Sequence, residues 1–163
     1  MQREYAAFLR AISNVKMQPF RAAMEEMGFT EVDSYGMSGN LLFNAPESDP
    51  AALEQRLTNK FDTTAFVRTR AELERVVGGN PFRGRDGAAV LFLAHAPNTT
   101  RRQALMNLDY ETEPPVLRGR TVFFIYPVRL RGSRTALDFE RALEVEGTAR
   151  SARVIDRVFS AMS

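Results

Sequence analysis

Hydrophobic and polar positions alternate with two different periods along the chain, and the order of these periods predicts the fold. Residues 3–9 alternate loosely and end in an apolar run, which predicts a strand, and the segments 31–36, 40–44 and 63–68 are also predicted to be strands. Two segments have apolar residues three or four positions apart, as amphipathic helices do. Their apolar stripes are Met17, Phe20, Met24 and Met27 in the first, and Leu53, Leu57 and Phe61 in the second. The first 68 residues therefore predict β-α-β-β-α-β, the ferredoxin-like order.

Local signals agree with these elements. Gly28 stands where a helix C-cap glycine is expected, after a helix with Pro19 in its first turn. Asp49 and Pro50 predict the start of the second helix, with Asp as the N-cap and Pro at the first helical position. The turn residues Ser38-Gly39-Asn40 predict a hairpin between the two short strands.

A capping box follows the first predicted plait. Thr69 and Glu72 have the spacing in which each side chain bonds the other residue's backbone N–H. The helix that they start carries Leu73, Val76 and Val77, and Gly78-Gly79 ends it. The glycine-rich loop 79–87 is the best candidate for a boundary between halves, because the sign of the net charge also changes there.

The second half repeats the order of the first. Ala88–Ala94 is a nearly continuous apolar run, which favours a central strand. A helix capped by Asn98 or Thr99, strands near 115–118 and 121–126, a helix capped by Ser133 and a strand near 145–149 follow. The chain ends in a helix whose apolar face is Val154, Ile155, Val158, Phe159 and Met162.

These patterns predict an α+β protein of two ferredoxin-like plaits in tandem, residues 1–82 and 83–163. We expect antiparallel sheets with helices packed on one face, an extra C-terminal helix, and the two halves forming one compact unit. The halves share a pattern of elements, and no repeat of individual letters is evident between them.

Composition narrows the possible functions. The 163 residues are 44% hydrophobic and 26% charged, which is typical of a globular protein. The chain has no cysteine, which excludes a disulfide framework, a thiolate zinc site and a cysteine nucleophile. With no signal-peptide pattern at the start and no apolar run approaching about 18 residues, we expect a soluble, cytoplasmic protein with no membrane contact.

The second half is mildly basic. Residues 1–82 carry a net charge of −2 and residues 83–163 a net charge of +4. Arginine outnumbers lysine throughout, since Lys16 and Lys60 are the only lysines. Arginine binds phosphate through paired N–H donors, so the excess favours an anionic ligand. A general bias toward arginine over the whole chain explains the same numbers.

Several short motifs, in order, resemble one bacterial family. Residues 8–12 resemble an opening "LLRGI", residues 28–43 resemble "GFTDV…SGNVVF", residues 68–82 resemble "RT…EL…NPF", and residues 148–150 with the following helix resemble a closing "TTRNW". Together they resemble the bacterial domain-of-unknown-function family 1697 over nearly the whole chain. The resemblance implies tandem ferredoxin-like plaits and brings no established activity.

The chain departs from that family pattern in two places. Ala11 replaces a glycine of a glycine-rich loop, which is shortened here to residues 13–16. Ser151 replaces an asparagine, and no tryptophan follows it. If the glycine-rich loop contacts a ligand in the relatives, this chain has altered that contact.

No group of residues predicts a catalytic or metal site. His95 is the only histidine and has no nucleophile or acid nearby in sequence, so we interpret it as the polar end of a strand. Asp109, Glu111 and Glu113 precede Pro114-Pro115 and are interpreted as a solvated connection. Phe123, Phe124 and Tyr126 lie in a densely apolar strand, which favours core packing over stacking on nucleic-acid bases. We therefore expect no catalytic residue, no metal and no cofactor.

The leading hypothesis is a non-catalytic binding module for an anionic ligand, either a nucleotide or a nucleic acid. Two alternatives remain open: a small enzyme with its site between the halves, and a scaffold that dimerises through a sheet edge. The protein is expected to be a monomer or a homodimer. Candidate ligand-binding residues are Arg10, Ser38, Asn40, Arg118, Arg120 and Arg150. Family motif positions suggest that Arg10, Ser38, Asn40 and Arg150 converge.

Overall fold

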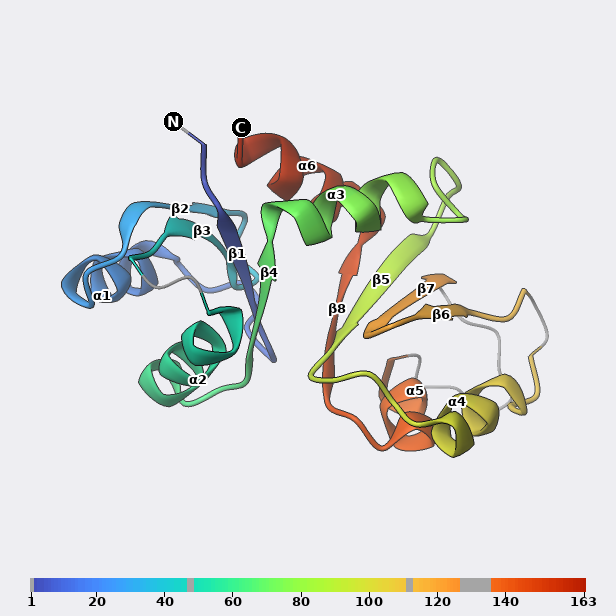
Figure 1. Ribbon diagram of the computed structural model, residues 1–163. Coiled ribbons are helices and arrows are strands. Elements are labelled where there is room, and N and C mark those ends of the chain that lie inside the picture. The colour runs from blue at the N-terminus through green and yellow to red at the C-terminus, as the bar shows by residue number, and fades with distance from the viewer. Residues whose placement is uncertain (1, 47–48, 111–112, 127–135) are drawn as a thin grey trace. The chain divides into compact units, whose positions relative to one another are not determined.

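The computed structural model describes residues 2–46, 49–110, 113–126 and 136–163 (Figure 1). The first plait consists of β1 (Tyr5–Leu9), α1 (Gln18–Glu26), β2 (Thr30–Tyr35), β3 (Asn40–Asn44), α2 (Pro50–Phe61) and β4 (Ala65–Thr69). Helix α3 (Arg70–Gly79) follows it. The second plait consists of β5 (Ala88–Leu93), α4 (Thr99–Met106), β6 (Val116–Arg118), β7 (Thr121–Ile125), α5 (Ala136–Leu143) and β8 (Gly147–Ser151), and α6 (Ala152–Ala161) ends the fold.

The predicted fold class is confirmed. Each plait has the β-α-β-β-α-β order and a four-stranded antiparallel sheet, with strand orders β2-β3-β1-β4 and β6-β7-β5-β8. The predicted strand near 145–149 is found two residues later, as β8. The predicted helix cap Ser133 lies outside the described residues. So do three arginines of the basic second half, at positions 129, 131 and 134.

The chain divides into two compact units at a different place from the predicted halves. The first unit contains residues 1–75 and 156–163, and the second contains residues 76–155. Loop 79–87, the predicted boundary, therefore lies within the second unit. The division falls inside α3, between residues 75 and 76, and inside α6, between residues 155 and 156.

The first sheet packs one face against α1 and α2 (Figure 1). Apolar side chains from alternate positions of its strands meet the helices there, and they form a buried cluster of Tyr5, Ala7, Leu9, Met24, Phe29, Leu41, Phe43, Leu53, Leu57, Ala65 and Val67. The methionine at 24 is fully buried, as the helical spacing predicts. Burial of this apolar area is the main stabilising contribution to the unit.

The second sheet is built in the same way, and α4 and α5 pack on one of its faces. Its cluster consists of Ala89, Leu91, Leu93, Leu105, Val122, Phe124, Phe139, Leu143 and Val145. Phe123 and Phe124 are 2% and 1% exposed, so neither ring is presented for stacking on a base, whereas Tyr126 is half exposed.

Three predicted helix starts are capped as expected in the described residues. The Asp49 side chain accepts from the Ala51 N–H at 3.1 Å, and the Asn98 side chain accepts from the Arg101 N–H at 2.9 Å. Thr69 and Glu72 form the reciprocal capping box, with both bonds at 3.1 Å. These contacts satisfy N–H groups that a helix cannot satisfy within its first turn.

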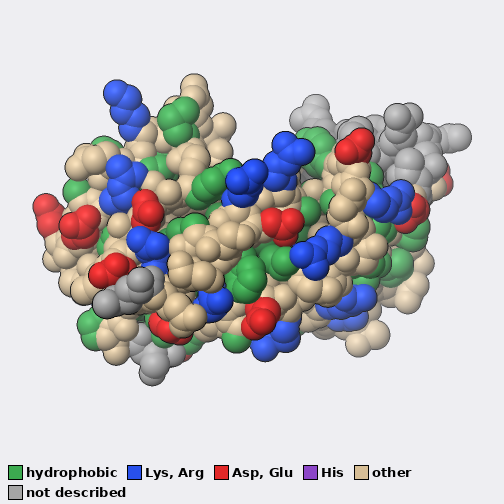
Figure 2. Space-filling model, turned by 90° about the horizontal axis from the view of Figure 1, so that it is seen from above, with side chains coloured by type: hydrophobic (Ala, Val, Ile, Leu, Met, Phe, Trp, Pro, Cys, Tyr) green, Lys and Arg blue, Asp and Glu red, His purple; other side chains and the backbone are tan. Residues whose placement is uncertain are grey.

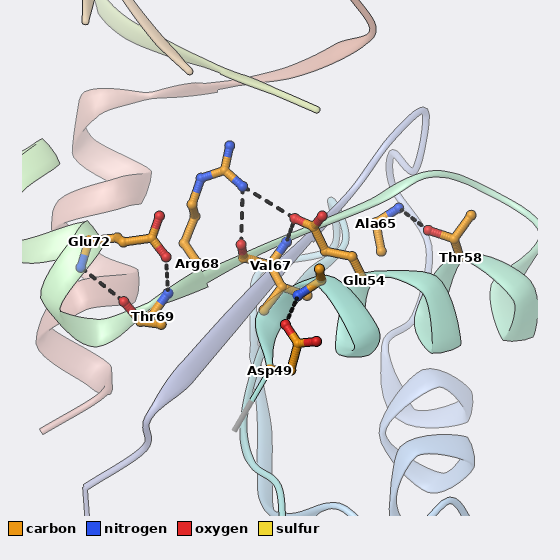
Figure 3. A network of polar contacts seen from close by, with 9 residues as sticks. Asp49, Glu54, Thr58, Ala65, Val67, Arg68, Thr69 and Glu72 are labelled. Atoms are coloured by element: carbon orange, nitrogen blue, oxygen red, sulfur yellow. Dashed lines mark hydrogen bonds and ion pairs between the residues drawn. The ribbon is translucent and has the colours of Figure 1, made fainter. Parts of the chain in front are cut away.

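Side chains cover the outer edge of β4. The Arg10 N–H donates to Thr64 O, and the Arg70 N–H donates to Glu4 O. These two bonds determine which backbone N–H groups of β4 point toward β1 and which point away from it. By the alternation of an antiparallel ladder, the N–H groups of Ala65, Val67 and Thr69 point outward. They donate to Thr58 Oγ1, Glu54 Oε2 and Glu72 Oε1 at 3.0, 2.8 and 3.1 Å, respectively (Figure 3).

Arg3 joins the two ends of the chain within the first unit (Figure 1). Its backbone N–H donates to Met162 O at 2.7 Å, and its guanidinium donates to Ala161 O and to Glu31 O. The carbonyls at 161 and 162 belong to the C-terminal end of α6, where a cation is favourable. None of the helices in the described ranges is long and apolar enough to cross a membrane.

Candidate functional site

Two segments of the first unit, residues 10–16 and residues 36–39, are held together by their backbones. The Leu9 N–H donates to Gly39 O at 2.9 Å, and the Val15 N–H donates to Met37 O at 3.1 Å. Gly39 has φ +75° and no room for a side chain, because a Cβ atom there would lie 2.9 Å from the Leu9 Cβ. We call the surface formed by residues 10–16 and 36–39 the loop–hairpin surface.

The loop–hairpin surface is cationic. No aspartate or glutamate occurs between Glu4 and Glu25, or between Asp33 and Glu47. The first of these stretches carries Arg10 and Lys16, and Lys16 is exposed. The rest of the first unit contains many carboxylates, so the lack of carboxylates in these two segments distinguishes them from the rest of the unit. Asp62 stands two residues before Thr64, whose carbonyl accepts from the Arg10 N–H.

Polar and apolar groups are both exposed on this surface. Ser13, Asn14 and Ser38 are exposed. The backbone-bonded pair Val15 and Met37 is 40% and 47% exposed. Hydroxyl, amide and cationic groups therefore lie beside exposed apolar side chains.

The loop holds two non-glycine residues in a left-handed conformation. Ala11 has φ 60° and Asn14 has φ 54°. Asparagine tolerates this region, whereas alanine is strained there by its Cβ atom. The family glycine that Ala11 replaces is the residue that such a φ favours.

The structure brings together the three predicted site residues of the first unit, with different roles. Arg10 is partly buried, and its backbone is fixed on both sides by bonds to Thr64 O and from Thr63 Oγ1. Ser38 is exposed in the hairpin turn. Asn40 is 2% exposed, and its Nδ2 donates to Tyr35 O at 3.1 Å, so it stabilises the hairpin.

The three predicted site residues of the second unit are not gathered in one place. Arg118 and Arg120 flank Gly119 in the turn between β6 and β7, whereas Arg150 lies on β8 at the opposite edge of the sheet. Three strand spacings separate the two edges, or about 14 Å. The convergence of Arg150 with residues of the first unit stays a prediction.

Arg118 makes structural contacts. Its guanidinium donates to Gly79 O at the end of α3 and lies 5.7 Å from the centre of the Phe123 ring. A cation is favourable at a helix C-terminus, and it is attracted to the face of an aromatic ring. The backbone carbonyl of Arg120 accepts from the Leu93 N–H at 2.9 Å.

Arg150 is desolvated. Its Nη1 donates to Thr148 Oγ1 at 2.7 Å and to Ala149 O at 2.9 Å. Burial lowers the pKa of Arg150 to about 10 because it disfavours the charged form. The guanidinium is still charged at neutral pH.

Other residues considered in the sequence have ordinary surroundings. His95 is exposed, and its Nδ1 lies 3.3 Å from Ala96 O. Glu113 forms an ion pair with Arg85 at 2.6 Å, and both side chains are half exposed. Within the described parts of the chain, no three His, Asp or Glu side chains are grouped so that they could hold a metal ion. Basic and acidic side chains alternate on the face shown in Figure 2, without a single large patch of either sign.

Loop 79–87 is ordered by its own hydrogen bonds. The N–H groups of Phe82, Arg83 and Arg85 donate to Asn80 Oδ1, Asn80 O and Phe82 O. The Ala88 N–H donates to Arg85 O. Donors used in this way cannot also cradle a phosphate.

Sequence reasoning did not select Glu54 and Arg68. Arg68 is 1% exposed, and its Nη1 lies 3.4 Å from Glu54 Oε2 and 3.0 Å from Val67 O (Figure 3). A basic residue in an otherwise apolar strand, preceding a capping box, was the available signal.

Comparison with known proteins identifies the family. The family described as "Protein of unknown function (DUF1697)" matches residues 1–123. The chain belongs to this family. The solved structure of the conserved bacterial protein SP0830 from Streptococcus pneumoniae is similar over 99% of each chain, with a TM-score of 0.74 and 20% sequence identity. At this identity the similarity shows that the DUF1697 protein described here and SP0830 share a fold, and it gives no information about the activity of either protein. No curated protein matches the sequence.

Proposed function

We propose that this DUF1697 protein is a non-catalytic binding module for an anionic ligand, a nucleotide or nucleic acid, and that the ligand contacts the loop–hairpin surface. The observation that carries the proposal is the joining of two segments without carboxylates, residues 10–16 and 36–39, into one exposed cationic surface. Both segments adjoin or contain the family motifs at Arg10 and Ser38-Gly39-Asn40.

The chemistry of the surface suits a phosphate group. Lys16 supplies an exposed ammonium, and the hydroxyls of Ser13 and Ser38 are exposed hydrogen-bond donors. Neither segment contains a carboxylate, which favours an anion at this surface. The arginines of the second unit are weaker candidates for the binding site. The guanidinium of Arg118, for example, already donates to Gly79 O.

Two further observations favour a binding module over the alternatives. The only histidine, His95, is exposed beside a backbone carbonyl, which supports a non-catalytic role. The outward N–H groups of β4 are taken by side chains, which disfavours a scaffold that pairs through this edge. We place the module in the cytoplasm, and the lack of cysteine is in keeping with a reducing compartment.

Fluorescence anisotropy with short single- and double-stranded DNA and RNA tests the proposal. We expect binding that weakens as salt rises, since phosphate contacts release counterions. Lys16→Glu is expected to weaken binding by about tenfold at low salt, a loss of roughly 1.4 kcal/mol. The control is Arg75→Glu, which makes the same charge change at an exposed position of α3. Equal losses in the two variants would mean that net charge, and not this surface, controls binding.

A further inference from the structure

Two exposed apolar side chains lie together on the loop–hairpin surface. Val15 is 40% exposed and Met37 is 47% exposed, and the Val15 N–H donates to Met37 O at 3.1 Å. The other large hydrophobic side chains that are exposed in the described residues, Met106, Tyr126 and Leu137, belong to the second unit. Within the described residues of the first unit, exposed apolar side chains of this size are therefore confined to this surface.

The loop that carries Val15 is anchored on both sides of it. Met17 is 3% exposed, and Ile12 packs against the buried cluster of the first unit. Gly39 of the hairpin lies so close to the loop that a Cβ atom there would be 3.1 Å from the Ile12 Cβ. The apolar pair is consequently held in place before any ligand arrives, which reduces the ordering that binding requires.

Both apolar residues stand next to polar groups. Lys16 follows Val15 and Ser38 follows Met37, and both Lys16 and Ser38 are exposed. Neither segment of the surface contains a carboxylate. A ligand that matches this surface therefore has an apolar face beside an anionic group, and a nucleotide has both in its base and its phosphate.

The small size of the apolar pair narrows the choice of occupant. Two side chains present far less than the roughly 800 Å² per partner that a stable protein interface buries. A duplex offers mainly phosphates and sugars to such a surface, because its bases are stacked inside the helix. An unpaired base has a free aromatic face, and the sulfur of methionine makes favourable contacts with aromatic rings. An unpaired base beside its phosphate is thus the group that uses both the apolar and the cationic side chains.

We propose that the loop–hairpin surface binds an unpaired nucleobase together with its phosphate, with the base against Val15 and Met37 and the phosphate against Lys16. This inference rests on the proposed function and narrows its ligand to single-stranded nucleic acid or a free nucleotide, excluding duplexes and anions without a base. Lys16 supplies the salt-dependent part of the affinity. Val15 and Met37 supply a part that does not weaken as salt rises.

The test compares a short labelled single strand with the duplex of the same sequence by fluorescence anisotropy, over a range of salt concentrations. Charge alone favours the duplex, which carries more phosphates per unit length. We expect the single strand to bind more tightly, by about fivefold. Met37→Gln keeps the length of the side chain and removes its apolar character. It is expected to weaken single-strand binding by about fivefold with no change in the salt dependence, whereas Lys16→Glu is expected to reduce that dependence.

Met106→Gln is the matched control, because Met106 is 44% exposed at the end of α4 in the second unit. It is expected to leave single-strand binding unchanged. Met37→Leu retains an apolar side chain and is expected to bind within about twofold of the wild type. Equal losses in Met37→Gln and Met106→Gln would overturn the placement of the base against Met37.

The outcomes separate this inference from the proposed function. Duplex binding as tight as single-strand binding, with no effect of Met37→Gln, would overturn the inference and leave an anion-binding surface in place. No binding of either nucleic acid at low salt would overturn both. Competition distinguishes the two sources of the base, since adenosine monophosphate displaces the labelled strand as well as an unlabelled strand does only if a single nucleotide fills the site. Inorganic phosphate that competes as well as adenosine monophosphate would contradict a role for the base.

Discussion

The carboxylate of Glu54 on α2 lies 3.4 Å from the guanidinium of Arg68 on β4, and the same oxygen accepts from the Val67 N–H. One acidic side chain therefore satisfies both an outward backbone donor and a buried cation. An edge strand with free donors can pair with another chain, so this contact protects the fold as well as stabilising it.

Glu54→Gln is expected to lower the free energy of unfolding by about 2–4 kcal/mol, because it removes the negative charge beside the buried Arg68 guanidinium. Urea unfolding followed by circular dichroism measures the loss. Glu74→Gln, at an exposed position of α3, is the control and should change stability by less than about 0.5 kcal/mol. A loss in Glu54→Gln no greater than in the control would contradict the assigned role.

Gly39→Ala and Gly36→Ala form a matched pair in the hairpin turn. Both glycines have positive φ, +75° and +66°, but only at Gly39 would a Cβ atom collide with Leu9 and Ile12. We expect Gly36→Ala to lower the free energy of unfolding by about 1 kcal/mol, from backbone strain alone. Gly39→Ala should cost at least about 1 kcal/mol more, from overpacking. Thermal unfolding compares the two, and equal costs would argue against close contact of the loop with the hairpin.

Ala11→Gly is expected to stabilise the protein by up to about 1 kcal/mol, because glycine adopts φ 60° without strain. Ala52→Gly in α2 is the contrasting variant and should destabilise by about 0.5–1 kcal/mol, since glycine disfavours a helix interior. Chemical denaturation of both variants gives the two signs. Destabilisation by Ala11→Gly would show that the left-handed conformation carries no penalty for alanine in this loop.

Stability is expected to fall in alkaline solution through Tyr110. Burial raises the pKa of Tyr110 above its ordinary value of 10.0, and its hydroxyl donates to Leu105 O at 2.8 Å. Above pH 10 the unfolded chain loses this proton while the folded protein retains it, so the free energy of unfolding decreases with rising pH. Tyr110→Phe should reduce that slope. An unchanged slope between pH 10 and 11.5 would assign alkaline unfolding to other groups.

The sequence predicted the features that depend on neighbouring residues. The Thr69–Glu72 capping box, the Asp49 cap and the turn at Ser38-Gly39-Asn40 are each encoded within four residues, and the structure contains all three. The β-α-β-β-α-β order followed from the two hydrophobic periods, which are likewise local.

Contacts between distant segments could not be predicted in this way. Glu54 and Val67 are joined only once α2 packs beside β4, and the hydrophobic pattern sets neither the pairing nor the role of Arg68. Residues 156–163 belong to the first unit, where they accept bonds from Arg3 at the other end of the chain.

The most direct test of the central claim is to map an anionic ligand onto the protein by ¹H–¹⁵N NMR, using a short single-stranded oligonucleotide at low salt. The account predicts that the largest shifts fall on residues 10–16 and 36–40, and that they diminish as salt rises. It also predicts that Lys16→Glu removes most of them while Arg75→Glu does not. Shifts confined to the second unit, or no shifts at low salt, would contradict an anion-binding role for the loop–hairpin surface.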